Sequence, residues 1–256
     1  MTQYDVINDL TVVILTKNEE LNIVDVISNA KQVTNKVLIV DSGSTDKTIE
    51  LAESRGVRVI FRKWDNNFAA QRNFALEYVQ TEWVLYLDAD ERINDELAVA
   101  IKKVMQAPRE AMYRFIRRNS AFGKDFKYGV LGPDSVVRMF PKDKVQWQDK
   151  VHERPVSNLP LITLQGFLKH HTYKDFDQYI SKMNVYSTIG AQSYKDKNKK
   201  VGVLKDFVFR PFFAFVKMYF LKKGFMEGWL GFVLCLNYAN YTLQKYIKLK
   251  LLNEEK

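Results

Sequence analysis

The sequence lacks a glycine-rich phosphate loop. Neither G-x-x-x-x-G-K nor G-x-G-x-x-G occurs in its 256 residues. A nucleotidyltransferase normally carries such a loop after its first strand, where backbone N–H groups hold the phosphates. If this protein binds a nucleotide, it must hold the phosphates in another way.

Cysteine and export signals are also scarce. The single Cys235 lies in an apolar stretch and has no partner for a disulfide, which indicates a buried packing thiol in a reducing compartment. The first ten residues, M-T-Q-Y-D-V-I-N-D-L, contain neither a basic start nor an apolar run. We therefore expect no signal peptide and a cytoplasmic protein.

Long uninterrupted apolar runs are missing as well. Charged or amide residues interrupt both apolar segments near the C-terminus, 207–221 and 224–241, so neither supplies the roughly 18 apolar residues of a spanning helix. Two helices lying in the plane of a membrane, flanked by Lys222 and Lys223, fit the pattern better. The alternative is a helical hairpin that packs on the main domain or on a second subunit.

Charge is concentrated at the C-terminal end. The net charge is +9, and residues 195–256 hold 13 Lys and Arg against 5 Asp and Glu, which leaves 26 against 25 for residues 1–194. A nearly neutral body with a basic, aromatic tail favours docking on an anionic membrane over binding nucleic acid. We expect one domain at 1–194 and a helical extension at 195–256.

Strand and helix patterns alternate through the first hundred residues. Apolar strands are expected at 10–15, 36–40, 57–61 and 83–87, and helices at 21–30 and 67–79. This alternation predicts an α/β fold with a mostly parallel, Rossmann-like sheet flanked by helices. Beyond residue 110 the pattern is less regular. Short strands and turns are expected at 112–130, strands at 136–140 and 161–168, and a helix at 175–194.

Acidic residues follow the second and fourth of these strands. Asp88 and Asp90 stand where strand 83–87 ends, at the sheet edge that binds ligands in open α/β proteins. Carboxylates at this spacing can hold Mg²⁺ or Mn²⁺ together with phosphates, although an Asp after a strand can also be only a turn or cap residue. A calcium loop is excluded because Arg92 and Ile93 occupy positions that need a ligand and a glycine.

Asp41 ends the second strand in the same way. Ser44 or Thr45 can cap the following helix, with Asp46 in its first turn. Capping does not account for Asp41, which precedes the turn.

Several motifs in order resemble a known family. They are V-V-I-L-T-K-N-E-E, V-D-S-G-S-T-D-K-T, Q-R-N, L-D-A-D-E, V-V-R-M-F, V-H-E and H-H-T-Y. Together they resemble family 2 glycosyltransferases of the GT-A fold, and among these the bacterial lipopolysaccharide-core glucosyltransferases. The resemblance covers essentially the whole chain. It implies a nucleotide-binding half at 1–110, an acceptor half at 111–194 and a membrane-associating C-terminal extension.

The resemblance implies a role for each matching residue on the donor side. Thr16 and Glu19 match positions that line the uracil and ribose pocket, and Asp41 matches the acid that pairs with the uracil edge. Arg72 matches an arginine on the nucleotide side. Asp88 matches the acid near the ribose.

The resemblance also implies a metal site. Asp90 matches the acid that binds Mg²⁺ or Mn²⁺ at the diphosphate, and His170 matches its histidine partner, with His171 as the second choice. An inverting transfer also needs a base that takes the proton of the acceptor hydroxyl. Glu153 of the V-H-E motif is the first choice for that base and Asp149 the rival.

The expected activity is therefore inverting, metal-dependent transfer of a hexose from a UDP-sugar, with glucose as the first choice for the hexose. The expected acceptor is a hydroxyl of a membrane-associated glycan or glycolipid in cell-envelope polysaccharide synthesis, on the inner face of the membrane. A nucleotidyltransferase and a polyanion-binding or nucleic-acid-binding module are the alternatives. Acids at several strand ends argue against the second. The donor sugar, the acceptor, the linkage and an oligomer through the C-terminal helices stay open.

Overall fold

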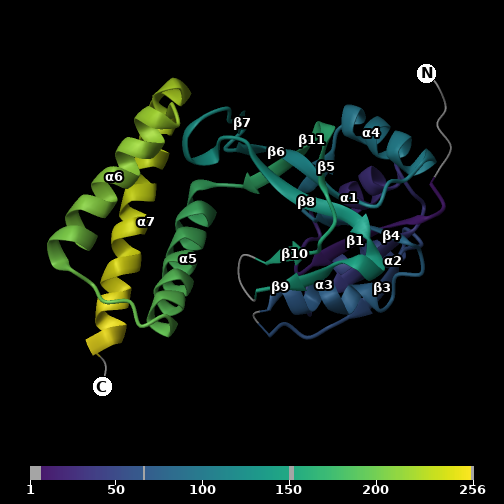
Figure 1. Ribbon diagram of the computed structural model, residues 1–256, viewed down its shortest axis with the longest axis horizontal. Coiled ribbons are helices and arrows are strands. Elements are labelled where there is room, and N and C mark those ends of the chain that lie inside the picture. The colour runs from purple at the N-terminus through teal and green to yellow at the C-terminus, as the bar shows by residue number, and fades with distance from the viewer. Residues whose placement is uncertain (1–6, 66, 150–152, 255–256) are drawn as a thin grey trace. The chain divides into compact units, whose positions relative to one another are not determined.

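The computed structural model of the protein (Figure 1) describes residues 7–65, 67–149 and 153–254. The chain forms two compact units. The first contains Met1–Arg117 and Asp134–His170, and the second contains Arg118–Pro133 and His171–Lys256. The predicted domain boundary at residue 194 stays a prediction.

The first unit is built on a mixed sheet. Among the described residues, its strands lie in the order β3-β2-β1-β4-β8-β6-β11-β5. Their bounds are β1 Leu10–Thr16, β2 Val37–Asp41, β3 Arg58–Phe61, β4 Trp83–Asp88, β5 Glu91–Ile93, β6 Met112–Ala121, β8 Asp134–Pro141 and β11 Leu161–Tyr173. Strands β3, β2, β1 and β4 pair in parallel, whereas β8 pairs antiparallel with β4 and β6. The expected α/β fold with a mostly parallel sheet flanked by helices is confirmed, and the division into a nucleotide-binding half and an acceptor half stays a prediction.

Helices cover both faces of this sheet (Figure 1). Their bounds are α1 Ile23–Ala30, α2 Thr48–Glu53, α3 Phe68–Leu76 and α4 Asp95–Gln106. Alternate residues of each central strand enter two separate cores. Val12 and Leu85 pack with residues of α1, α2 and α4, whereas Val13 and Val84 pack with residues of α3. The unbroken apolar runs of the sequence follow from this burial on both sides.

Strand β11 is fixed against the start of α4. The Asn94 side chain caps α4 by accepting from Leu97 N at 3.1 Å, and the same oxygen accepts from Phe167 N at 2.8 Å. Gly166 has a φ of +87°, and a Cβ atom there would lie 2.2 Å from Leu97 N. Only glycine satisfies both the conformation and the space at this position.

The second unit is mainly helical. It contains β7 at Lys124–Asp125, a 3₁₀ turn at Gly129–Leu131 and the ends of β6 and β11, followed by α5 Phe176–Asp196, α6 Arg210–Val216 and α7 Gly228–Glu254. Two π-helical turns, Val203–Phe209 and Lys217–Leu221, flank α6. Helix α7 packs against both α5 and α6 (Figure 1).

The C-terminal segments differ from the expectation in one respect. The second of the two expected helices, 224–241, does not end at 241: from Gly228 onward it continues through the basic residues 243–252 as the single helix α7. Within the part of the chain that the structure describes, no helix combines the length and apolar character that crossing a membrane requires. Both apolar segments nevertheless have exposed aromatic side chains. Phe212 and Phe213 of segment 207–221 are 58% and 61% exposed, and Trp229 of segment 224–241 is 74% exposed.

Candidate active site

Three parallel strands end together in the first unit. The register pairs Thr16 at the end of β1 with Asp41 at the end of β2, and Leu15 of β1 with Asp88 at the end of β4. The residues that follow these strands therefore share one edge of the sheet. The residues proposed first from the sequence as donor-binding residues, metal ligands and base belong to this unit. His171, the second choice for a metal ligand, belongs to the other unit.

Asp41 is fully buried and forms the turn that follows β2. Its Oδ1 accepts hydrogen bonds from Gly43 N and Ser44 N, both at 2.8 Å, and its Oδ2 accepts from Thr16 Oγ1 at 3.2 Å and from Ser44 Oγ. The carboxylate thus ties the ends of β1 and β2 to the loop. Gly43 has a φ of +101°, which suits the turn.

The expected helix cap is wrong. Helix α2 begins at Thr48 after Lys47, which makes no side-chain cap. Ser44 binds Asp41 instead, and Asp46 Oδ1 accepts from Thr48 N at 3.0 Å. Asp41 therefore accepts most of its hydrogen bonds from its own turn, a role that the sequence did not reveal.

The T-K-N-E-E loop is held against the loop after β2. Glu19 N donates to Thr48 Oγ1 at 2.7 Å, and Asn18 N donates to Ser44 Oγ at 2.8 Å. The Glu19 carboxylate accepts from Asn22 at 2.7 Å at the entrance to α1. The two loops that carry Thr16, Glu19 and Asp41 therefore form one connected edge.

Arg72 lies at the centre of the site. Its guanidinium donates to Asp88 Oδ1 at 2.9 Å and to Glu153 Oε1 at 3.2 Å, and its side chain is only 3% exposed. The aromatic rings of Trp147 and Tyr86 lie 4.7 and 5.3 Å from the guanidinium. Its Nη1 has no hydrogen-bond partner among the described residues. A buried cationic donor in this state is suited to an anionic ligand.

Asp88 joins Arg72 to a second arginine, Arg138 of β8. Arg138 donates to the other Asp88 oxygen and to Glu91 Oε1 at 2.8 Å, and Arg117 lies 3.3 Å from the same Glu91 oxygen. Burial raises the pKa of Asp88, but Arg138 and Arg72 lower it more, so the carboxylate stays ionised. Alternating charges thus run from Glu91 to Glu153 through Arg138, Asp88 and Arg72.

Sequence reasoning missed Arg138 and Glu91. Arg138 is 5% exposed and Glu91 is fully buried, although both are charged. The signal was an arginine inside the apolar strand pattern V-V-R-M-F, since a buried charge needs a partner. The partners could not be read from the sequence because Asp88 lies 50 positions from Arg138.

Asp90 and His170 come together as the resemblance implied. His170 Nε2 lies 3.3 Å from Asp90 Oδ2, because antiparallel pairing of β5 with β11 sets His170 opposite Glu91. His171 Nδ1 instead lies 3.2 Å from Ser120 Oγ in the second unit. Adjacent residues of a strand point to opposite faces, so only one of the two histidines can face Asp90.

The Asp90 and His170 donor atoms fit a shared cation. Two ligands at about 2.1 Å from one octahedral ion lie roughly 3 Å apart, close to the observed separation. Within the described residues, no group of three or more His, Cys, Asp or Glu side chains could enclose a metal. A site with two protein ligands matches Mg²⁺-type binding, in which substrate phosphates and water complete the coordination.

The two candidate bases have different surroundings. Glu153 is 18% exposed and binds Arg72, whereas Asp149 is 54% exposed and binds Arg154 at 3.1 Å. Asp149 also has a φ of +69°. Residues 150–152, including His152 of the V-H-E motif, lie outside the described residues.

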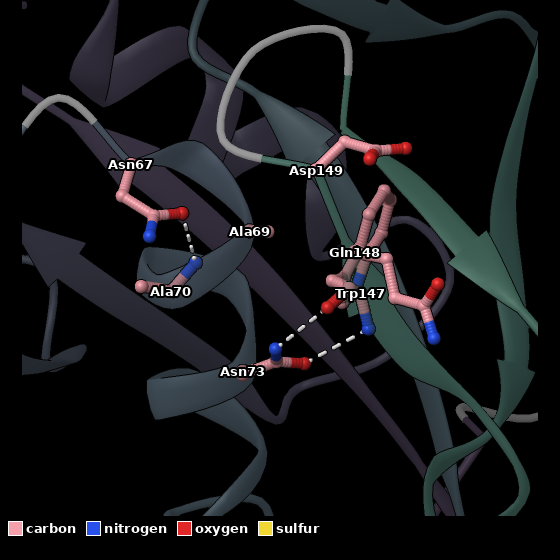
Figure 2. Close-up of a pocket in the computed structure, with 7 residues that line it drawn as sticks. All are labelled: Asn67, Ala69, Ala70, Asn73, Trp147, Gln148 and Asp149. Atoms are coloured by element: carbon pink, nitrogen blue, oxygen red, sulfur yellow. Dashed lines mark hydrogen bonds between the residues drawn. The ribbon is translucent and has the colours of Figure 1, made fainter.

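A cavity of about 410 Å³ adjoins Asp149 (Figure 2). Its lining consists of Asn67, Ala69, Ala70, Asn73, Trp147, Gln148 and Asp149. The Asn73 amide joins α3 to β9 (Gln146–Gln148) through two hydrogen bonds of 2.9 Å with the Trp147 backbone. The named lining residues combine amide side chains with two alanines and a tryptophan, and one of them, Asp149, is charged.

Comparison with known proteins identifies the class. Residues 11–156 match the model of glycosyl transferase family 2, so the chain belongs to that family. A lipopolysaccharide core biosynthesis glycosyltransferase, LpsC from Rhizobium meliloti, is 28% identical over 91% of this chain and 88% of its own length. An uncharacterised glycosyltransferase from Rickettsia typhi is 27% identical over 94% of this chain and 86% of its own length.

A solved structure confirms the GT-A fold. The mannosyltransferase PcManGT from Pyrobaculum calidifontis, determined with GDP-Man and Mn²⁺, is similar with a TM-score of 0.54. The similarity covers 96% of this chain and 88% of that chain at 15% identity. The protein is therefore a glycosyltransferase with a GT-A fold and a long C-terminal helix.

Proposed function

We propose that the protein transfers a hexose from a UDP-sugar to a hydroxyl of a membrane-associated glycan or glycolipid, with inversion and with Mg²⁺ or Mn²⁺. Glucose is the first choice for the hexose. The observation that carries the proposal is the ion-paired array of Arg72, Asp88 and Glu153, together with the Asp90–His170 pair, in a family 2 chain. The similarity to LpsC supports a role in cell-envelope polysaccharide synthesis.

The loops after β1 and β2 are proposed to hold the uridine. Thr16 and Glu19 line this edge, and Asp41 pairs with the uracil. The two Asp41 oxygens already accept four hydrogen bonds, so uracil N–H can bind only if one of the two hydroxyls on Oδ2, that of Thr16 or that of Ser44, turns away. A carboxylate has about four acceptor sites, which makes this exchange a requirement of the proposal.

Asp90 and His170 are the proposed metal ligands. When bound there, the cation supplies positive charge that stabilises the diphosphate leaving group. Arg72 adds a second positive charge, its Nη1 has no hydrogen-bond partner in the part of the chain that the structure describes, and Asp88 fixes its position. The ion pair of Arg72 with Asp88 and the contact of His170 with Asp90 hold these side chains in place, and fixed charges of this kind are the condition for strong electrostatic stabilisation of a transition state.

Glu153 is the proposed base. It takes the proton of the acceptor hydroxyl while that oxygen attacks the anomeric carbon and the bond from that carbon to the diphosphate breaks. The ion pair with Arg72 keeps Glu153 next to the donor-binding arginine, whereas Asp149 is bound to Arg154 and mostly exposed. This difference supports Glu153 over its rival.

The experiment is a nucleotide-sugar screen. Thermal shifts are measured for UDP-sugars and GDP-sugars with and without Mn²⁺, because a ligand that binds the native state raises its apparent stability. Metal-dependent stabilisation by a UDP-sugar, followed by UDP release with an acceptor, is the expected result. Release of pyrophosphate would instead identify a nucleotidyltransferase, and stabilisation by GDP-sugars alone would overturn the choice of donor.

A further inference from the structure

The end of α5, the loop after it, the start of α6 and helix α7 together carry a cluster of cations stacked on tyrosines in the second unit. We define the cationic tyrosine cluster as Tyr194, Lys199, Arg210, Lys245 and Tyr246. Lys199 Nζ lies 3.8 Å from the centre of the Tyr194 ring and donates to Tyr246 Oη at 3.2 Å. Lys245 Nζ lies 4.9 Å from Tyr194, and the Arg210 guanidinium lies 5.2 Å from Tyr246.

The positive charge of this cluster is only partly neutralised. Among the described residues, Asp206 is the one carboxylate that forms an ion pair with any of the three cations, and its partner is Arg210. Asp206 is 3% exposed and also accepts from Gly202 N at 2.8 Å. Burial raises the pKa of Tyr194, but Lys245 and Lys199 lower it more, which reports the excess positive potential.

The cluster is preorganised for a phosphate oxygen. Stacking on a tyrosine face positions an ammonium group while leaving some of its N–H donors free. Hydrogen bonds from ionised donors to phosphate are stronger than those between neutral groups. Two lysines held near one another repel, so a bound anion would also relieve that repulsion.

Exposed apolar residues lie between Lys199 and Lys245 along the chain, on both sides of Arg210. They are Val203, Leu204, Val208, Phe209, Phe212 and Phe213, each between 49% and 63% exposed. Lys205 lies among them and forms no ion pair with any described residue. A cationic site beside exposed aromatic side chains combines the two contacts that a membrane-surface segment makes, one to the headgroup and one to the acyl boundary.

We propose that the cationic tyrosine cluster binds the headgroup phosphate of an anionic phospholipid while Phe212 and Phe213 enter the interface of the same bilayer. The proposal rests on the proposed function, which it deepens by assigning the residues that contact lipid. A second copy of the chain is the poorer occupant. A twofold interface centred on the cluster would bring its three cations close to those of the second copy, and like charges repel.

The test measures partition of the full chain onto vesicles. Lys199→Gln/Lys245→Gln is compared with wild type on phosphatidylcholine vesicles with and without phosphatidylglycerol. The matched control Lys36→Gln/Lys102→Gln removes the same charge from the first unit. Because each lysine at an anionic surface contributes a roughly fivefold effect, we expect partition of the cluster variant to weaken about 30-fold, against less than about threefold for the control.

Two further variants separate the contributions. Phe212→Ser/Phe213→Ser is expected to weaken partition on both kinds of vesicle, since these exposed rings supply apolar contact. Lys199→Arg/Lys245→Arg retains the charge and is expected to partition as wild type does. Thermal melting of every variant shows that it is folded. Equal partition by the cluster variant and the control would overturn the site.

Free phosphate is tested as the other source of the same chemistry. At constant ionic strength, inorganic phosphate is expected to leave vesicle partition almost unchanged. Phosphate that stabilises wild type but not the cluster variant, without vesicle binding, would overturn the lipid assignment, and so would tighter binding to nucleic acid than to vesicles. UDP-dependent thermal shifts are read in parallel. If they persist in the cluster variant, only the lipid site fails, and the proposed glycosyl transfer is unaffected.

Discussion

Arg72 and Glu153, which are 81 positions apart in the chain, form an ion pair of 3.2 Å. The same guanidinium binds Asp88, so one arginine connects the proposed base to the end of β4. If Arg72 moved toward an arriving diphosphate, its ion pair with Glu153 would therefore lengthen or shift. In the proposed mechanism, this geometry would couple donor binding to the position of the base.

The first prediction concerns Arg72. Arg72→Lys keeps a positive charge but loses the planar guanidinium, whose several N–H donors can contact Asp88, Glu153 and the ligand at the same time. We expect kcat to fall about 10²-fold, the scale for removing one group that stabilises transition-state charge. Steady-state UDP release at saturating donor measures it. Arg62→Lys, in an ion pair with the exposed Asp65, is the control and should be close to wild type.

The second prediction concerns the base. Glu153→Gln should reduce kcat by about 10² to 10⁴-fold at saturating donor, because the amide cannot accept the proton. Asp149→Asn should change kcat by less than about tenfold, within the range of an indirect effect. If the Asp149 variant alone loses activity, the assignment of Glu153 is wrong.

The third prediction concerns the cation. Asp90→Asn and His170→Ala should each raise the Mn²⁺ concentration needed for half-maximal activity, and Asp90→Asn should lower the maximal rate about 10²-fold or more. Mn²⁺ titrations of activity and of UDP-dependent thermal shift provide the measurement. Asp95→Asn, in the exposed first turn of α4, is the control. Retention of more than about a tenth of the rate by Asp90→Asn would contradict the metal role.

The fourth prediction concerns the buried pair of Glu91 and Arg138. Glu91→Ala leaves Arg138 buried with fewer partners, and breaking such a pair costs about 3–5 kcal/mol. Urea unfolding should report this loss. Glu110→Ala, in an exposed pair with Lys144 at 3.9 Å, should change the free energy of unfolding by less than about 1 kcal/mol. Similar losses for both variants would show that burial of the network is not decisive.

The fifth prediction concerns pH. Burial raises the pKa of the Cys235 thiol to about 11. At pH 8 only about one molecule in 10³ then carries the reactive thiolate, so a thiol reagent should modify the native protein far more slowly than the urea-unfolded one. Because the folded pKa lies above the unfolded value, this group's contribution to stability is complete below about pH 9. It is lost as pH rises toward 11. Equal labelling of native and unfolded protein would contradict burial.

The sequence was sufficient for the parallel half of the sheet. Strands such as Trp83–Asp88 are covered on both faces, so their apolar runs are continuous. Acids mark the ends of β2 and β4. The C-terminal helix was harder. Asn240 and Thr242 have only modest helix propensity, so local pattern could not decide whether segments 224–241 and 243–252 join. Packing against α5 and α6 supports the continuous helix α7.

Pairing across long distances was not accessible to sequence reasoning. The D-x-D spacing indicated a ligand edge, but it could not separate the surroundings of Asp88 from those of Asp90. The structure binds Asp88 to two arginines and sets Asp90 beside His170. Both outcomes depend on strand order, because β8 brings Arg138 next to β4 and β11 brings His170 next to β5.

The glycine at position 166 gives this arrangement a remote weak point. A methyl group there would push β11 away from the first turn of α4, and His170 lies four residues further along the same strand. In the proposed mechanism, an inactive variant could thus arise because the His170 imidazole is misplaced, although every side chain proposed to bind the donor is still present. Mutational surveys that score only loss of turnover would assign this position to chemistry, whereas its contribution is the alignment of one strand.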